Sequence, residues 1–142
     1  EYNKNPYDLE PEEGHLIGRY FKEEYGADFV FVTHYPSKKR PFYAMDSADD
    51  PKLAESFDLL FRGLEITTGG QRIHDYNELL EKMKRYHMEE GDLGAYTDIF
   101  KYGMPPHGGL GIGLERVVMK MLGLANIREA SLFPRDIHHL DP

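Results

Sequence analysis

The stretch HGGLGIGLERVVMKML at residues 107–122 changes its hydrophobic period partway along, and this change decides how the chain folds there. From Gly109 to Gly113 glycine alternates with large apolar residues, which is the period of two that predicts a β-strand. From Leu114 onward the apolar residues recur at helical spacing, at Val117, Val118, Met121 and Leu122. The sequence therefore predicts a strand that runs directly into a helix, which ends at Gly123.

Glycines in phase leave one face of this strand without side chains. Gly109, Gly111 and Gly113 point to one face, and Leu110 and Ile112 point to the other. Glycine weakens a strand, so something flat or bulky is expected to lie close against the backbone. A nucleotide is one such partner, and a closely packed helix is the alternative. The pattern is neither a dinucleotide fingerprint nor a Walker loop.

Arg116 follows the last glycine and stands in the first turn of the predicted helix. A cation is unfavourable there because the helix dipole places positive charge at the same end. The position is explained if the guanidinium meets an anion, and phosphates bind well at helix N-termini. The sequence therefore favours a nucleotide site, with the base or ribose on the glycine face and a phosphate at Arg116.

A second polar group occurs in FDLLFRGLEITTGGQRIH at residues 57–74. We expect residues 56–70 to form one long strand with an internal glycine at Gly63. Asp58 and Glu65 would then point to opposite faces, unless Gly63 carries a bulge.

The side chains of this segment suit magnesium and a carboxylate ligand. Asp58, Glu65 and the hydroxyl of Thr68 offer the hard oxygen atoms that bind magnesium bridging phosphates. Arg72 could hold a carboxylate in bidentate fashion. An exposed strand with ordinary salt bridges is the alternative that the segment leaves open.

The remaining patterns predict an α+β fold, an antiparallel sheet flanked by helices. The expected order is αβββααβα, followed by a short terminal strand after Gly123. The elements before the glycine strand are helices over 11–25, from Asp75 to about His87 and over 92–102, and strands over 28–36, 41–45 and 56–70.

The length, composition and net charge of the chain exclude several classes of protein and of binding site. The 142 residues, 40% of them hydrophobic, suffice for one domain, and the absence of cysteine excludes disulfides and thiolate metal sites. With no apolar stretch near the roughly 20 residues of a membrane span, we expect a soluble, cytoplasmic protein without membrane contact. The net charge of −8 argues against general nucleic-acid binding. Local RNA contacts are one interpretation of residues 38–40 and of Arg135 with His138 and His139; ordinary solvated segments are the other. We assign no role to His107.

Three segments together resemble one family. GLGIGLER at 109–116 resembles motif 3 of the class II aminoacyl-tRNA synthetases. With it, the segment 57–74, YGMPPHGGLGIGLERVVM and LFPRD resemble aspartyl-tRNA synthetases of the branch shared by archaea and eukaryotes. The resemblance extends from about Phe29 to Pro142. Asp136 and the segment GGQRIH match the aspartyl pattern rather than the asparaginyl one.

The resemblance implies ATP-dependent activation of L-aspartate to aspartyl-adenylate and its transfer to tRNA(Asp). It makes Arg116 a catalytic residue that holds ATP, with Gly113, Leu114 and Glu115 in the same nucleotide-binding segment. It makes Glu65 a ligand of Mg²⁺ and a contact to ATP. Such chemistry relies on positioning and charge neutralisation, so no general base is needed.

The resemblance also implies the site of the amino acid. Thr68 stands beside metal and aspartate, and Arg72 is the catalytic arginine that pairs with the substrate's side-chain carboxylate. Asp58 is a further acid near the metal.

The domain assignment follows from the same resemblance. Residues 1–142 match the C-terminal portion of a class II catalytic domain, and no anticodon-binding OB-fold, motif 1 or motif 2 is recognisable. Because the chain begins at Glu1, we expect a fragment, inactive alone, of a homodimeric enzyme. The alternatives are a stand-alone paralogue with a binding or regulatory role, an asparaginyl-tRNA synthetase or amide-forming ligase relative, and a structural domain that has lost its chemistry.

Overall fold

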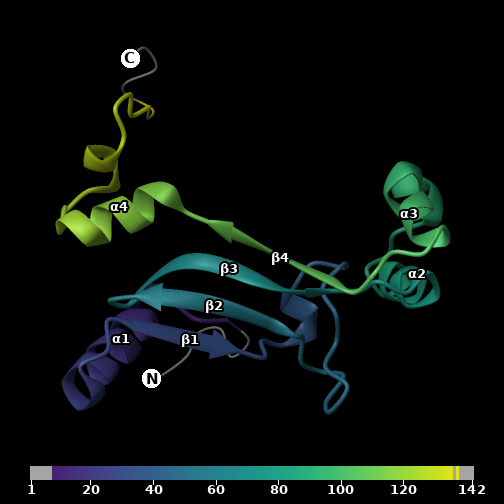
Figure 1. The fold of residues 1–142 in the computed structure, drawn as a ribbon, viewed down its shortest axis with the longest axis horizontal. Helices are drawn as coiled ribbons and strands as arrows, with labels where there is room; N and C mark the ends of the chain where they lie inside the picture. The colour runs from purple at the N-terminus through teal and green to yellow at the C-terminus, as the bar shows by residue number, and fades with distance from the viewer. Residues whose placement is uncertain (1–7, 136, 138–142) are drawn as a thin grey trace. The chain divides into compact units, whose positions relative to one another are not determined.

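The computed structural model describes residues 8–135 and 137. These divide into two compact units. The first unit includes 32–57 and 69–110, and the second includes 9–31, 58–68 and the chain from 111 onward. The elements, labelled in Figure 1, are α1 (Pro11–Tyr25), β1 (Phe29–Thr33), η1 (Ser37–Lys39), β2 (Ser56–Phe61), β3 (Leu64–Arg72), α2 (Tyr76–Arg85), η2 (Glu90–Leu93), α3 (Gly94–Lys101), β4 (His107–Ile112), α4 (Leu114–Leu122) and η3 (Ile127–Ala130).

The four strands form one sheet in the order β1-β2-β3-β4 (Figure 1). Each strand begins in one unit and ends in the other, so both units contain part of every strand. Neighbouring strands in the sheet are also neighbours among the strands of the sequence. The antiparallel sheet with helices confirms the predicted α+β class.

The expected single strand over 56–70 is wrong, because the chain turns back at Arg62 and Gly63. Both residues have positive φ, 48° and 78°. Positive φ at both central residues is what a two-residue hairpin turn of type I′ requires. The double glycine does not stop the strand, because Gly69 and Gly70 lie inside β3.

The strand expected over 41–45 is also wrong. Ala44 forms only an isolated antiparallel bridge with Arg72. The neighbour of β1 in the sheet is β2, and β1 is shorter than expected, ending just before His34, whose φ is 59°. The order αβββααβα is nevertheless correct, because the missing strand at 41–45 is compensated by the division of 56–70 into two.

The helices agree more closely with the sequence, because their signals are local. Helix α1 matches the predicted span and ends at Gly26, which has a φ of 65°. The Asp75 side chain accepts hydrogen bonds from the amides of Asn77 and Glu78 and so begins α2. Helix α2 ends at Arg85, short of His87, which has a φ of 58°.

The junction at Gly113 is confirmed. Strand β4 ends at Ile112, and α4 begins at Leu114 and is capped by Gly123 in the left-handed conformation. The expected terminal strand is wrong for the part of the chain that the structure describes, where the short helix η3 follows α4 instead.

Each unit has its own packing. In the first, Ile73, Leu79, Met83 and Phe100 form a buried cluster. In the second, α1 packs on the β2–β3 turn through glycine: a Cβ on Gly18 would lie 2.4 Å from the Gly63 nitrogen. A larger residue at this position would therefore push the helix away from the hairpin.

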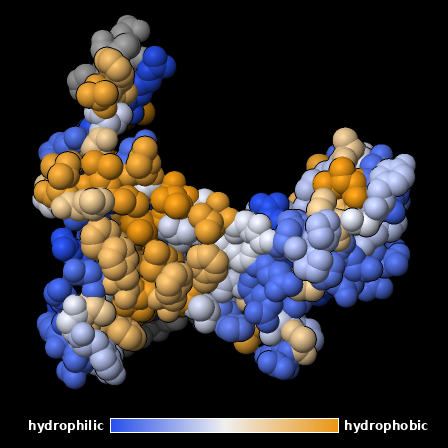
Figure 2. All heavy atoms as spheres, viewed as in Figure 1, coloured by the Kyte–Doolittle hydropathy of each residue, from blue (hydrophilic) through white to orange (hydrophobic). Residues whose placement is uncertain are grey.

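The second unit also exposes large apolar side chains. Figure 2 shows hydrophobic surface over α4 and neighbouring segments, and Phe31 and Ile112 are each 62% exposed. Extended apolar surfaces of this kind are typical of protein interfaces. Among residues 8–135 and 137, no helix has the length and apolar character needed to cross a membrane.

Candidate active site

Arg116 in the second unit is held at the start of α4 by the backbone and side chain of Glu65. Its Nη1 donates a hydrogen bond of 2.8 Å to the Glu65 carbonyl oxygen and lies 3.4 Å from Glu65 Oε1. Both side chains are 44% exposed. The carbonyl contact fixes the guanidinium, and the exposure leaves it accessible to a ligand.

Gly113 permits this arrangement. Its amide donates a hydrogen bond of 2.8 Å to the Ile66 carbonyl, which ties the end of β4 to β3. A Cβ on Gly113 would lie 3.3 Å from Cδ of Arg116. The arginine stem therefore lies against the glycine backbone, and a side chain at 113 would shift it.

The glycine face of β4 is covered at two of its three positions by arginine side chains. In the first unit, a Cβ on Gly109 would lie 3.1 Å from Nε of Arg72, and in the second the neighbour of Gly113 is Arg116. A Cβ on Gly111 would meet no atom within 4 Å. The neighbour at Gly109 belongs to β3, and the neighbour at Gly113 belongs to α4, the helix that directly follows the strand. Among the described residues, no other helix lies against these glycines.

Asp58 and Thr68 are brought together by the β2–β3 hairpin in the second unit. The Thr68 hydroxyl donates a hydrogen bond of 2.5 Å to Asp58 Oδ1. Asp58 is buried, with 5% exposure, whereas Thr68 is exposed. The question of opposite faces of one strand does not arise, because Asp58 and Glu65 lie on neighbouring strands.

The oxygen donors of this unit suit a magnesium ion. Asp58 and Glu65 supply carboxylates and Thr68 a hydroxyl, all hard ligands. Within the described residues no group of three or more His, Cys, Asp or Glu side chains forms a metal cluster. Magnesium typically takes one or two carboxylates, with water and substrate phosphates completing its shell. The structure joins Asp58 with Thr68, and Glu65 with Arg116.

Arg72 in the first unit is positioned by Tyr43. The guanidinium carbon lies 4.3 Å from the centroid of the Tyr43 ring, a cation–π arrangement. The bridge between Ala44 and Arg72 holds the two segments together. Sequence reasoning missed Tyr43, because it placed residues 41–45 in a β-strand and gave no sign that they lie next to the end of β3.

The model of the family described as "tRNA synthetases class II (D, K and N)" matches residues 2–137. The chain belongs to this family. Among curated relatives, this class II synthetase chain is 52% identical over 140 residues to the aspartate–tRNA(Asp/Asn) ligase of Deinococcus radiodurans. The match covers 95% of the chain and 32% of that relative, so the chain spans about a third of its length.

Solved structures of class II synthetases also match the chain. The synthetase chain superposes on an aspartyl tRNA synthetase from Entamoeba histolytica with a TM-score of 0.93 and 40% identity, covering 99% of the chain and 29% of that structure. For the asparaginyl-tRNA synthetase of Pyrococcus horikoshii complexed with asparaginyl-adenylate, the TM-score is 0.87 and the identity 32%, covering 99% and 32%.

The structure also shows where the other residues singled out in the sequence lie. Leu114 and Glu115 are exposed in the first turn of α4. His107 Nδ1 lies 3.0 Å from the Pro105 carbonyl oxygen, which fits a structural role at the start of β4. Asp136, His138 and His139 lie outside the described residues.

Proposed function

We propose that this chain is part of the catalytic domain of an aspartate–tRNA ligase. The observation that carries the proposal is the anchored, half-exposed Arg116 at a glycine-lined strand–helix junction. Membership in the class II synthetase family and the aspartate-specific names of similar proteins support it. The asparaginyl alternative is retained, because a solved asparaginyl-tRNA synthetase also matches the fold.

In the proposed reaction a carboxylate oxygen of aspartate attacks the α-phosphorus of ATP. A new phosphorus–oxygen bond forms, the bond to the pyrophosphate oxygen breaks, and aspartyl-adenylate results. The ester transfer to tRNA(Asp) follows and releases AMP. Catalysis of such steps depends on positioning and on neutralising phosphate charge.

We assign the nucleotide to the second unit. Arg116 binds ATP phosphate, and Gly113, Leu114 and Glu115 supply the adjoining segment. Glu65 fixes the guanidinium through its carbonyl oxygen, and its carboxylate, whose Oε1 lies 3.4 Å from Arg116 Nη1, would also serve as a ligand of Mg²⁺. Asp58 and Thr68 would complete the protein part of that shell. The metal would neutralise charge on the phosphates.

We assign the aspartate side chain to Arg72 in the first unit. The planar guanidinium can bind a carboxylate with two parallel hydrogen bonds. Stacking on Tyr43 keeps the guanidinium plane oriented, so less freedom is lost on binding. An amide cannot accept two such bonds, and Arg72 therefore favours aspartate over asparagine.

The whole enzyme is longer in this proposal. Residues 1–142 form the C-terminal portion of its catalytic domain, with motif 3 at 109–116, and the parent acts as a cytoplasmic homodimer on tRNA(Asp). The isolated 142 residues are expected to catalyse no aspartate-dependent ATP–pyrophosphate exchange, whereas the parent enzyme does. Robust exchange by the 142-residue chain would contradict our proposal that the rest of the parent enzyme supplies part of the active site.

A binding experiment tests the residue assignments. Non-hydrolysable sulfamoyl analogues of aspartyl-adenylate and asparaginyl-adenylate are titrated into the parent enzyme by calorimetry. Arg116→Ala weakens both analogues by about 10- to 100-fold, because charge-assisted hydrogen bonds to phosphate-like groups are lost. Arg72→Gln weakens the aspartyl analogue more than the asparaginyl one. Equal losses for the two analogues would contradict the role of Arg72.

Gly111→Ala is a sharper probe of the glycine face. The added methyl group meets no described protein atom within 4 Å, so the protein is not destabilised. If a nucleotide lies across this strand, the methyl group weakens binding of both analogues severalfold. Arg19→Ala, an exposed arginine on α1, is the control. Unchanged affinity in Gly111→Ala would remove the nucleotide from this face.

A further inference from the structure

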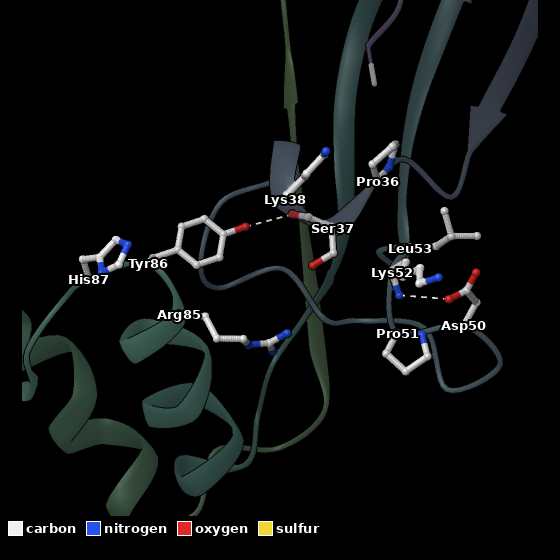
Figure 3. Close-up of a pocket in the computed structure, with 10 residues that line it drawn as sticks. All are labelled: Pro36, Ser37, Lys38, Asp50, Pro51, Lys52, Leu53, Arg85, Tyr86 and His87. Carbon is white, nitrogen blue, oxygen red and sulfur yellow. Dashed lines mark hydrogen bonds between the residues drawn. The ribbon is translucent and has the colours of Figure 1, made fainter. Parts of the chain in front are cut away.

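The first unit contains a cavity of about 770 Å³ that no step of the proposed reaction uses. It is open to solvent on one side and is lined by the segment 36–38, the loop 50–53 and the residues 85–87 at the end of α2 (Figure 3). Neither Arg72 nor Tyr43 lines it. Its volume lies within the range of roughly 300–1,000 Å³ typical of small-molecule sites.

One wall of the cavity is apolar and fixed. Pro36, Pro51 and Leu53 contribute aliphatic surface, and Tyr86 contributes an aromatic ring. The Tyr86 hydroxyl lies 2.8 Å from the Ser37 carbonyl oxygen and 2.6 Å from that of Arg40. Because the hydroxyl is hydrogen-bonded to these backbone carbonyl groups, the Tyr86 ring is fixed and offers a flat surface to the cavity.

The rim of the cavity is positively charged, although the chain as a whole carries −8. Lys38, Lys52 and Arg85 line it, and His87 adds a further nitrogen base. Among the described residues that line the cavity, Asp50 is the one acidic residue, and its Oδ1 already accepts a hydrogen bond of 3.0 Å from the Lys52 amide. A local excess of positive charge on an acidic protein favours an anionic ligand.

Arg85 is positioned to face this ligand. Its Nη2 is 2.8 Å from Asp46 Oδ2, which anchors the guanidinium, and the side chain extends from the end of α2 toward the loop 50–53 (Figure 3). The carbonyl groups at this helix end would repel an anion if they were free. Those of Lys82, Met83 and Lys84 already accept hydrogen bonds from following backbone amides.

We propose that this cavity binds a nucleotide, with the base on the apolar wall at Tyr86 and the phosphate on the lysines and Arg85. A flat aromatic surface beside cations is the combination that holds the bases and backbone of single-stranded nucleic acid. Inorganic phosphate alone would leave the apolar wall uncovered. The nucleotide is either a free mononucleotide or one residue of a single-stranded RNA.

The ¹⁵N-labelled 142-residue chain is titrated with AMP, adenosine and inorganic phosphate, and amide shifts of Leu53, Tyr86 and His87 are followed by NMR. AMP shifts all three signals and saturates them. Adenosine and phosphate each bind at least about tenfold more weakly, because each lacks half of the contacts. Equal binding of phosphate and AMP, or no shift with AMP, would overturn the proposal.

Matched charge reversals separate this site from general electrostatics. Lys52→Glu and Lys38→Glu weaken AMP binding at these three amides by about tenfold or more. Lys39→Glu and Lys84→Glu change the net charge equally but alter exposed lysines that do not line the cavity, so they leave affinity within about twofold. Equal losses in all four variants would overturn the proposal.

Arg116→Ala distinguishes this inference from the proposed ligase function. The variant loses AMP binding at α4 but retains the shifts of Leu53, Tyr86 and His87. Disappearance of those shifts in Arg116→Ala would assign them to the other nucleotide site. A trimer of single-stranded RNA is the second probe: tighter binding than AMP, weakening steeply with salt, identifies RNA as the source of the nucleotide, and weaker binding identifies a free mononucleotide.

Discussion

Two ion pairs, one in each unit, differ in how much of them water can reach. In the first unit Lys82 binds Asp46 with 1% and 18% of the two side chains exposed. In the second unit Arg116 and Glu65 are 3.4 Å apart, and both are 44% exposed. A buried charge is costly unless it is fully paired, whereas an exposed pair can exchange its partner for a ligand at little cost.

The buried pair is accordingly surrounded by further hydrogen bonds. Lys82 Nζ also donates to the Ala44 carbonyl, and Asp46 accepts from Ser37 and Arg85. Burial lowers the pKa of Lys82, and the neighbouring Asp46 opposes this. The pair connects α2 to the chain at residues 44–46. The comparison therefore separates a pair that maintains the fold from a pair that is available for chemistry.

The largest expected effect follows from removing the buried carboxylate. Asp46→Asn leaves the Lys82 ammonium buried without its counter-ion and destabilises the chain by about 3 kcal/mol. Urea unfolding followed by circular dichroism measures the change. Asp49→Asn, three residues away and exposed, is the matched control and changes stability by less than about 0.5 kcal/mol. If Asp46→Asn and Asp49→Asn were equally stable, the buried ion pair would not maintain the fold, and the distinction between the two pairs would be wrong.

A pH titration gives a second, smaller effect. Burial raises the pKa of Asp46, but hydrogen bonds from Lys82, Ser37 and Arg85 outweigh it and hold that pKa below the usual 3.8. The group binds its proton more readily when unfolded, so its contribution is present above about pH 4 and is lost as pH falls through the lower folded pKa. Free energies of unfolding at pH 6 to 3 should decline, and less steeply in Asp46→Asn. Parallel declines in the two proteins would be inconsistent with this linkage.

The smallest expected effect concerns the exposed pair. Arg116→Ala changes the free energy of unfolding by at most about 1 kcal/mol, because solvent screens the charge interaction. The same urea experiment measures it, with Arg19→Ala as a control for an exposed arginine. A loss as large as that of Asp46→Asn would mean that Arg116 maintains the fold rather than serving a ligand.

The predicted elements were right where a local signal defines them. Pro11 and Gly26 bound α1, Asp75 caps α2, and the change of period at Gly113 marks the junction of β4 and α4. Each of these signals acts within one or two turns of chain. The boundaries that these signals set therefore depend little on the rest of the fold.

The predictions failed where pairing between strands decides the structure. The turn at Arg62 and Gly63 places an arginine at positive φ, an uncommon conformation that composition does not announce. Residues 41–45 contain strand-forming residues, yet they form only one isolated bridge, between Ala44 and Arg72, because the position beside β1 is taken by β2. Strand partners depend on the competition among all strands, which no single segment encodes.

The candidate site divides in the same way. The sequence by itself singled out Arg116, Glu65, Thr68, Asp58 and Arg72 as residue types suited to phosphate, magnesium and carboxylate, and their roles remain predictions. The fold decided that Glu65 anchors Arg116 and that Asp58 meets Thr68. Lys82, which resembles a surface lysine in the sequence, and Tyr43 acquired their partners only in the folded chain. Residue chemistry and helical period are properties of a segment. Burial and the pairing of distant residues, such as Asp46 and Lys82, which are 36 positions apart, exist only once the chain has folded.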